Sequence, residues 1–203
     1  MPAGPQRAFC TTALDQSLLS RPFGVQTSWH VIAGAPCSGK TTVIDALASR
    51  GYRTVPESGR AYIGGERAKG RTTAEIIADG LALQRGVLGL QLRTERRLTA
   101  SGVAFLDSGA PSCITYLRAM GLDPNAILAE CFHHRYASVF LLDRFPFQPD
   151  GVRFEDDVTA AFIQQWLPRD YGALGYGVVR VPVLPVEERL AFILDRLAEG
   201  GVT

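Results

Sequence analysis

The chain alternates short runs of apolar and β-branched residues with longer amphipathic stretches. The short runs lie at residues 29–33, 52–55, 103–107, 137–142 and 177–181, and glycine, proline or aspartate borders each of them. Brief continuous apolar runs of this kind are typical of strands that are buried on both faces of a parallel sheet. The pattern therefore predicts five such strands with helices between them.

Residues at helical spacing fill most of the intervening segments. Thr72 and Glu75 fit a capping box, and the leucines and isoleucines that follow predict one long helix from residue 72 to about residue 98. The apolar stripe at 76–92 indicates a face packed in the core, although such a face can also form a homodimer contact. Residues 57–62 are expected to form a loop or a short helix. Further helices are predicted at residues 40–50, 112–120, 124–133, 155–169 and 186–198.

Strands that alternate with helices in this way indicate an α/β fold of three layers, in which helices cover both faces of a mostly parallel sheet. Residues 1–28 do not share the pattern, since prolines and glycines interrupt them and leave room for one short helix at most. We expect an N-terminal extension at residues 1–28, followed by a single domain at residues 29–203.

Composition excludes several classes of partner. The 203 residues include 21 Lys and Arg against 20 Asp and Glu, so the chain lacks the basic excess of a typical nucleic-acid binder. No apolar stretch reaches the roughly 18–20 residues that a membrane span needs, and the N-terminus lacks the apolar run of a signal peptide. We expect a cytoplasmic protein that binds neither nucleic acid nor a membrane.

One motif carries specific chemistry. Residues 34–41 read Gly-Ala-Pro-Cys-Ser-Gly-Lys-Thr, which matches the phosphate-binding loop G-x-x-x-x-G-K-[ST] between a predicted strand and a predicted helix. In such a loop the backbone N–H groups and the helix N-terminus hold phosphate oxygens, the lysine reaches the β- and γ-phosphates, and the hydroxyl after it ligates Mg²⁺. We predict an ATP and Mg²⁺ site made by Gly34, Ala35, Pro36, Cys37, Ser38, Gly39, Lys40, Thr41 and Thr42.

Other sequence features narrow the class of P-loop protein. No aspartate begins a D-x-x-G motif, and Lys69, the only lysine besides Lys40, does not stand in N-K-x-D, so the two motifs of a GTPase are missing. No segment after the last predicted helix is long enough for the helical subdomain of an AAA+ motor. The compact P-loop phosphotransferases remain, in which loops at the carboxyl ends of the strands hold the phosphoryl acceptor.

The sequence also resembles the P-loop proteins described as AAA-domain predicted ATPases, which are relatives of nucleoside and nicotinamide-riboside kinases. Residues 34–42, 51–62, 105–109, 139–142, 150–156 and 186–194 carry the resemblance in order. It implies a five-stranded parallel sheet of the nucleotide-kinase type and an arginine-bearing lid after the fourth strand. One position departs from the family pattern of Asp-Arg-Gly after the third strand, because this chain has Ser108 between Asp107 and Gly109.

Five further residues are candidates for catalysis or substrate binding. Asp107 ends a buried strand, where a carboxylate can bind Mg²⁺ through water or take the proton of the acceptor hydroxyl. Glu57 and Arg60 follow the second strand and are candidate acceptor-binding residues, with Glu57 also a candidate base. Arg153, or otherwise Arg144, is the candidate lid arginine that approaches the transferring phosphoryl group.

Two functions fit these observations. The first is an enzyme that uses ATP and Mg²⁺ to phosphorylate a hydroxyl of a small metabolite, nucleoside-like or other, and the P-loop and the following carboxylates favour it. The alternative is a nucleotide-switched binding module that hydrolyses ATP slowly and acts on a protein partner, which the serine at position 108 and the N-terminal extension suggest.

Overall fold

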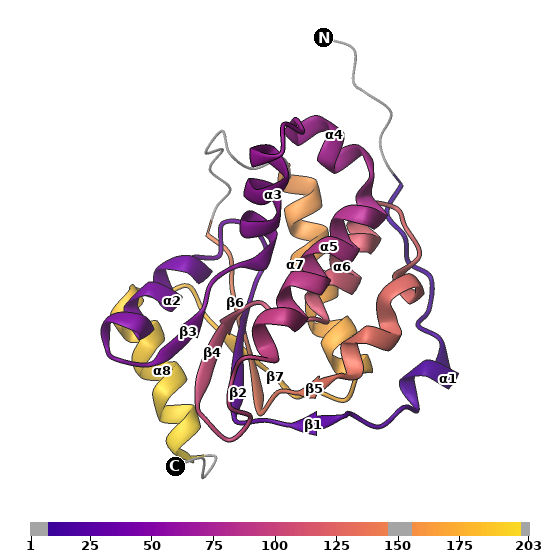
Figure 1. Ribbon diagram of the computed structural model, residues 1–203. Helices are drawn as coiled ribbons and strands as arrows, with labels where there is room; N and C mark the ends of the chain where they lie inside the picture. Colours follow the sequence, from indigo (N-terminus) through magenta and orange to yellow (C-terminus); the bar gives the residue numbers. More distant parts are fainter. Residues whose placement is uncertain (1–7, 146–155, 200–203) are drawn as a thin grey trace.

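A five-stranded sheet forms the centre of the computed structural model, which describes residues 8–145 and 156–199 (Figure 1). All neighbouring strands are parallel and their order is β3-β4-β2-β6-β7. Their bounds are β2 (Trp29–Ala33), β3 (Arg53–Val55), β4 (Ala104–Asp107), β6 (Ser138–Leu142) and β7 (Val178–Val181). The five strands predicted from the apolar runs are therefore confirmed, each to within a residue or two.

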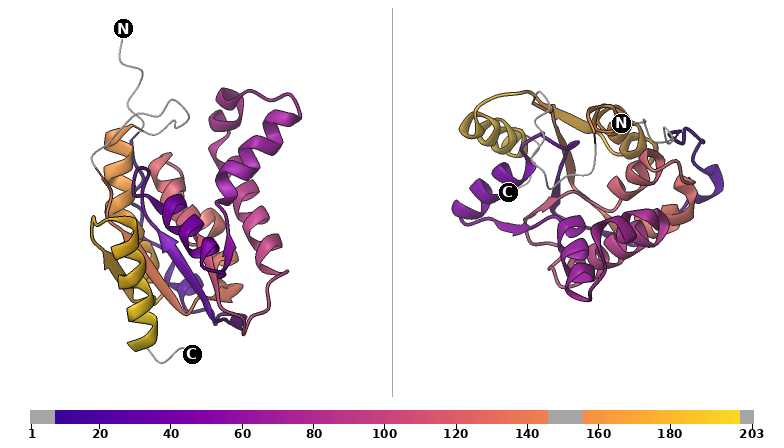
Figure 2. Two further views of the ribbon diagram at one scale, coloured as in Figure 1. Left: turned by 90° about the vertical axis from the view of Figure 1, so that its left-hand side faces the viewer. Right: turned by 90° about the horizontal axis from the view of Figure 1, so that it is seen from above.

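Helices cover both faces of the sheet and complete three layers (Figures 1 and 2). Successive strand residues point to opposite faces, so Ile32 and Phe105 pack in one core while Val31 and Leu106 pack in the other. On the first face lie α2 (Lys40–Ser49) and α8 (Val186–Glu199); on the second lie α5 (Gly80–Glu95), α6 (Ser112–Ala119) and α7 (Asp157–Ala173). The predicted α/β class is confirmed.

The single long helix predicted from residue 72 to about residue 98 is wrong. The capping box of Thr72 and Glu75 is present, but it opens only the short helix α4 (Thr73–Ala78). Asp79 then leaves the helical conformation, with φ −99° and ψ 73°, and its side chain accepts a hydrogen bond from Ala82 N at 3.1 Å to begin α5. The chain breaks there because an aspartate followed by glycine caps a new helix better than it continues an old one.

Two other segments differ in kind from their prediction. Residues 58–62 belong to a longer helix, α3 (Ser58–Ala68), for which Glu57 is the N-cap. Gly86 of α5 allows the close approach of α3, since a Cβ at Gly86 would lie 2.1 Å from the ring of Tyr62. The segment predicted as a helix at 124–133 is the 3₁₀ helix η1 (Pro124–Phe132). The apolar stripe of α5 is core, because Leu83, Leu88 and Leu92 are buried.

The described part of the N-terminal extension packs against the domain. It contains α1 (Gln16–Leu19) and β1 (Val25–Gln26), and β1 pairs in parallel with β5 (His134–Arg135) in a separate two-stranded sheet. The ring of Phe9 stacks on Phe162 of α7 at 4.1 Å, and Leu14 is buried. These contacts hold the extension along α6, α7 and η1, although the boundary at residue 28 stays a prediction.

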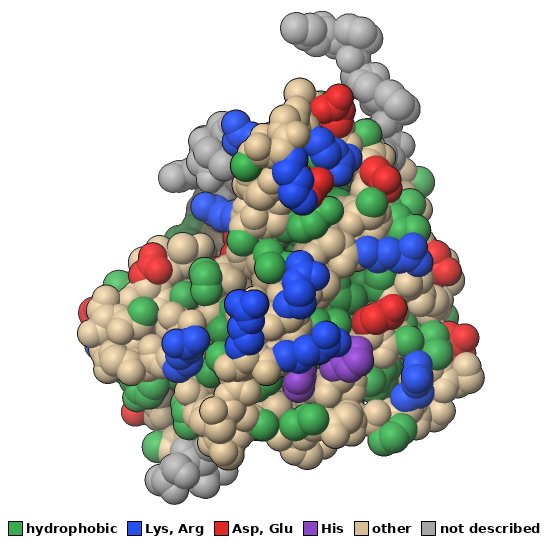
Figure 3. Space-filling view, viewed as in Figure 1, with side chains coloured by type: hydrophobic (Ala, Val, Ile, Leu, Met, Phe, Trp, Pro, Cys, Tyr) green, Lys and Arg blue, Asp and Glu red, His purple; other side chains and the backbone are tan. Residues whose placement is uncertain are grey.

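The surface is mixed in charge. On the face of Figure 3, Lys and Arg side chains are spread from the top of the view to its lower half, with Asp and Glu side chains among them and around the edge.

Among the helices of residues 8–145 and 156–199, none is both long and apolar enough to cross a membrane.

Candidate functional site

The P-loop joins β2 to α2 in the conformation that an anion site requires. Gly39, the N-cap of α2, has φ +81° and Cys37 has φ +64°, so the backbone turns through the left-handed region twice within the loop. Gly34 has no room for a side chain, because a Cβ there would lie 2.4 Å from Ser38 Oγ. The loop therefore brings the N-terminus of α2 and its backbone N–H groups to the carboxyl edge of the sheet.

Lys40 folds back over this loop. Its ammonium donates to the carbonyl oxygens of Gly34, at 2.8 Å, and Ala35, at 3.3 Å. No carboxylate within the described residues forms an ion pair with Lys40. Its charge is thus available to an anion in the loop.

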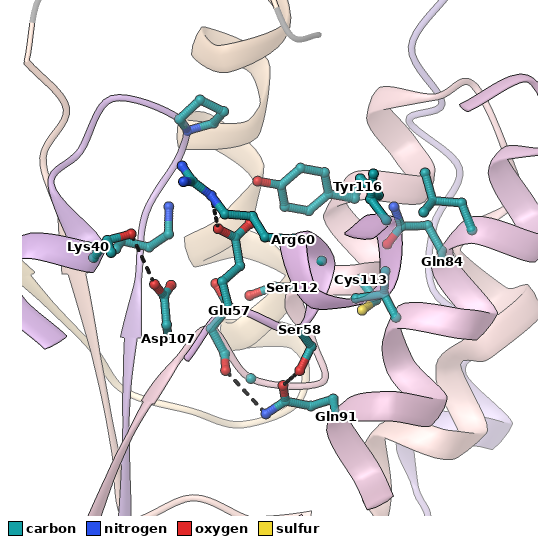
Figure 4. Close-up of a pocket in the computed structure, with 18 of the residues that line it drawn as sticks. Lys40, Glu57, Ser58, Arg60, Gln84, Gln91, Asp107, Ser112, Cys113 and Tyr116 are labelled. Atoms are coloured by element: carbon teal, nitrogen blue, oxygen red, sulfur yellow. Dashed lines mark hydrogen bonds and ion pairs between the residues drawn. The ribbon is translucent and has the colours of Figure 1, made fainter. Parts of the chain in front are cut away.

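Asp107 lies across from the P-loop because β4 is the neighbour of β2 in the sheet. Thr41 Oγ1 donates to Asp107 Oδ2 at 3.5 Å, and the pair marks one end of the site (Figure 4). Asp107 is only 2% exposed, and its other oxygen, Oδ1, has no hydrogen-bond partner in the part of the chain that the structure describes. Burial raises the pKa of Asp107 to about 6, against opposing effects of Lys40 and Arg60, while Glu57 raises it further.

A cavity of about 560 Å³ extends from this end of the site. The P-loop and Asp107 line one side, Glu57 and Arg60 at the start of α3 line another, and α5 and α6 close the far wall. Arg60 Nε donates to Glu57 Oε2 at 3.0 Å, and both side chains face the space in Figure 4. Ser108 lines the same cavity, so the position where the family pattern has arginine faces the space that an acceptor would fill.

A buried network fixes the floor of the cavity. Ser58 Oγ donates to Gln91 Oε1 at 2.6 Å, and Gln91 Nε2 donates to Glu95 Oε1 at 2.8 Å. Tyr136 also donates to Glu95 Oε1, at 2.8 Å, while His134 bonds to its other oxygen at 2.7 Å. Because each of these polar groups is paired, the first turn of α3 is held firmly against α5 beside Glu57.

Of the two candidate lid arginines, the structure describes Arg144. Arg153 lies outside the described residues, as does most of the predicted lid. Arg144 follows β6 and pairs with Asp157 at the start of α7, with its Nη1 3.4 Å from the Asp157 carbonyl oxygen. It does not line the cavity, and a catalytic role for either arginine stays a prediction.

Sequence reasoning missed two residues that support the P-loop. Arg189 of α8 is 1% exposed and donates to the carbonyl oxygens of Ser38, at 2.5 Å, and Asp143, at 2.9 Å. Gln164 of α7 accepts from Ala35 N at 3.1 Å and donates to Leu142 O at 3.2 Å. Both residues lie more than a hundred positions from the loop, and the only signal for Arg189 was its place in the last family segment, 186–194.

Burial of Asp107 has a measurable consequence for stability. Because its folded-state pKa of about 6 exceeds the usual 3.8, the folded protein binds this proton more tightly, and stability is lost as pH rises from about 4 to 6. Asp107→Asn removes the buried charge, so we expect the variant to melt at a higher temperature than the wild type at pH 8 but not at pH 4.5. Thermal unfolding of both proteins at the two pH values tests this.

The wild-type profile alone does not isolate this effect. Burial also lowers the pKa of His30 to about 4, which raises stability with pH over an overlapping range. The difference between wild type and Asp107→Asn cancels the His30 contribution. A melting-temperature difference that does not change with pH would contradict the assignment of a raised pKa to Asp107.

The architecture is similar to that of several solved structures, including two kinases. The NadR protein in complex with NR has a TM-score of 0.64 and 19% identity over 85% of this chain, which spans 51% of that protein. Deoxyadenosine kinase from M. mycoides has a TM-score of 0.60 and 12% identity, with 84% of this chain and 98% of that chain covered. Thymidylate kinase from Candida albicans has a TM-score of 0.57 and 14% identity over 87% and 93% of the two chains.

At these low identities, the TM-scores show a shared fold and nothing more specific. A search of curated proteins finds no significant match to the sequence. The family model described as an AAA domain, however, matches residues 29–189. This span runs from Trp29, the first residue of β2, to Arg189, which donates a hydrogen bond to the P-loop. The resemblance inferred from the motifs is confirmed: the chain belongs to this AAA domain family, and its fold is that of the P-loop kinases.

Proposed function

We propose that this protein is an ATP- and Mg²⁺-dependent phosphotransferase that acts on a hydroxyl group of a small molecule. One observation carries the proposal: a single cavity joins the P-loop, with Lys40 and Thr41, to the carboxylates of Asp107 and Glu57. Both ends of a phosphoryl transfer, the donor phosphates and the acceptor hydroxyl, fit within that one space. The kinase fold of the structural neighbours supports the same class of reaction.

The residues of the loop fit a nucleotide and its metal ion. Among the described residues, the Lys40 ammonium bonds only to loop carbonyl oxygens, and Asp107 Oδ1 is buried without a partner beside the Thr41 hydroxyl. A buried carboxylate oxygen left in this state is costly unless a cation or a donor completes it. When bound, ATP supplies the transferable phosphoryl group and Mg²⁺ neutralises charge on its oxygens.

The side chains of the site then have separate roles in the reaction. Lys40 would turn from the loop carbonyl oxygens to phosphate oxygens, and Thr41 with Asp107 would hold the metal side of the site. Glu57 is better placed than Asp107 to act as the base. Its Oε2 accepts a hydrogen bond from Arg60, while its Oε1 can accept the proton of the acceptor hydroxyl. As the acceptor oxygen bonds to phosphorus, the bond from phosphorus to the departing ADP oxygen breaks.

Acceptor-dependent formation of ADP tests this function. Full-length protein, ATP and Mg²⁺ are incubated with a panel of nucleosides, sugars and amino alcohols, and ADP is measured with the phosphorylated product. We expect at least one acceptor to raise ADP formation well above the rate without acceptor. We expect Glu57→Gln to lower that rate by about 10²-fold or more, since proton transfer to a positioned base contributes this much.

The matched control is Glu188→Gln, which makes the same change at an exposed position on α8. It should leave the rate unchanged. ADP formation that is identical with and without every acceptor would refute the phosphotransferase and favour the nucleotide-switched module. Stimulation of that basal rate by a protein partner would support the module directly.

A further inference from the structure

Gln91 of α5 joins the two chain segments that carry the carboxylates of the site. Its Oε1 accepts a hydrogen bond from Ser58 Oγ at 2.6 Å, and Ser58 is the residue after Glu57 (Figure 4). Its Nε2 donates to the Ser108 carbonyl oxygen at 3.4 Å, and Ser108 is the residue after Asp107. Gln91 is 4% exposed, so solvent has little access to either hydrogen bond. One side chain of α5 therefore connects the start of α3 to the turn that follows β4.

The carboxamide of Gln91 can take only one orientation. Its nitrogen faces the carboxylate of Glu95, at 2.8 Å, and the Ser108 carbonyl oxygen, and these two groups accept hydrogen bonds without donating them. The nitrogen has one N–H for each of them. Glu95 is itself fixed by the two further hydrogen bonds of the buried network. The oxygen of the carboxamide is therefore directed at Ser58 and cannot exchange places with the nitrogen.

The turn after β4 needs support of this kind. Ser108 has φ +67°, in the left-handed region that a residue with a side chain adopts only at a cost in free energy. Such a conformation persists where the surrounding contacts over-determine it. The Ser108 N–H donates to the carbonyl oxygen of Ile32 in β2 at 3.1 Å, and its own carbonyl oxygen accepts from Gln91. Both sides of the turn that begins at Asp107 are thus held.

The proposed reaction requires the two carboxylates in a fixed arrangement. Glu57 would take the proton of the acceptor hydroxyl while Asp107 would hold the metal side of the site. A misplacement of about 1 Å in such an arrangement can cost about 10²-fold in rate. Glu57 and Asp107 belong to different elements, so contacts between those elements set the distance between them. The link through Gln91 is one such contact, and it ends at the neighbour of each carboxylate.

We propose that Gln91 is a positioning residue, which holds the start of α3 and the turn after β4 in a fixed relation and thereby places Glu57 relative to Asp107. It acts through these two residues. Its nitrogen uses both N–H groups inside the protein and has no donor left for a ligand. This inference rests on the proposed function and adds to it a residue that supports both carboxylates.

Hydrogen exchange of the full-length protein without ligand tests the link directly. Gln91→Met keeps the length of the side chain and removes its hydrogen bonds. We expect the amides of residues 61–63 and of residues 108–110 to exchange about 5-fold faster or more, the equivalent of one lost hydrogen bond. Ser58→Ala leaves Glu95 with all of its partners and should raise exchange only at residues 61–63. Gln165→Met, the same change at an exposed position on α7, is the control and should alter neither segment.

Kinetics then separate positioning from a general structural role. With ATP, Mg²⁺ and the panel of nucleosides, sugars and amino alcohols, Ser58→Ala and Gln91→Met should each lower kcat for the active acceptor by about 10-fold or more. The Kd of a non-hydrolysable ATP analogue should stay within about 2-fold of the wild type. In the Glu57→Gln background, Ser58→Ala should lower kcat by about 2-fold or less, because the base whose position it sets is already gone.

The outcomes distinguish this inference from the proposed function. Unchanged exchange at residues 108–110 in Gln91→Met overturns the link. An equal loss of kcat on Ser58→Ala with and without Glu57 overturns the positioning role, and acceptor-dependent ADP formation in the same assay leaves the phosphotransferase standing. Faster exchange in both segments while no acceptor raises ADP formation supports the link through Gln91 and refutes the phosphotransferase alone.

Discussion

Replacement of Lys40 by alanine is expected to weaken ATP binding by roughly 10- to 100-fold, because the variant loses hydrogen bonds between a charged donor and phosphate oxygens. The acceptor-dependent rate should fall further, by about 10²- to 10³-fold, since charge that develops on the phosphoryl oxygens loses its nearest cation. Calorimetric titration with an ATP analogue measures the first effect and ADP formation measures the second.

The chain offers a matched control for this experiment. Lys69 is the only other lysine, its side chain is 73% exposed, and it pairs with Glu66 away from the P-loop. Lys69→Ala should bind the ATP analogue as the wild type does. A Lys40→Ala protein that binds ATP as tightly as the parent would refute both the phosphotransferase and the nucleotide-switched module, because both require nucleotide in this loop.

The largest expected effect on stability comes from Arg118 of α6. Its Nε donates to both oxygens of Asp170 in α7, at 3.0 and 3.2 Å, and both side chains are buried. Nη1 donates to the carbonyl oxygen of Thr12 at 2.5 Å, and the guanidinium lies 4.5 Å from the ring centre of Trp166. One side chain thus joins α6, α7 and the N-terminal extension.

Arg118→Met is expected to destabilise the protein by about 3–5 kcal/mol, because it leaves the carboxylate of Asp170 buried without its cation. For a chain of this size such a loss lowers the melting temperature by roughly 10 °C. Thermal unfolding at pH 7 measures it. Burial already raises the pKa of Asp170 above its usual value, so without Arg118 the group should take up a proton more readily.

Two further variants show whether the buried pair is responsible. Arg196→Met breaks an exposed contact with Glu199, at 3.5 Å, and should leave the melting temperature unchanged. The double variant Arg118→Met with Asp170→Leu removes both charges and should recover part of the loss, since an apolar replacement of a whole buried pair is often neutral. Equal melting temperatures for Arg118→Met and Arg196→Met would contradict this account.

Local sequence patterns predicted the strands, most of the helices and the P-loop end of the site. The β2 run, the P-loop and the start of α2 are contiguous in the chain, so strand, turn and helix N-terminus could be recognised together. The capping box at Thr72 was also correct, because its two hydrogen bonds span only three residues. The break at Asp79 was missed since the apolar spacing continues across it and only the local backbone turns.

The other end of the site is formed by contacts between residues that lie far apart in the sequence. Asp107 faces Thr41 only because β4 lies next to β2 in the sheet, and 66 positions separate the two residues. The cavity wall needs α3, α5 and α6 side by side, and the close contact of Gly86 with Tyr62 that permits it cannot be read from spacing.

By itself, then, the sequence determined the features that depend on a few neighbouring residues: five strands, most helices, the phosphate loop and the family. Tertiary structure alone decided which carboxylate lies against the P-loop and which arginine donates hydrogen bonds to it. The physical reason is the separation along the chain over which each interaction acts. Backbone periodicity, capping and a phosphate-binding turn act over a few residues, whereas the burial of Asp107 and the hydrogen bonds of Arg189 arise between segments that only the packed sheet and helices bring together.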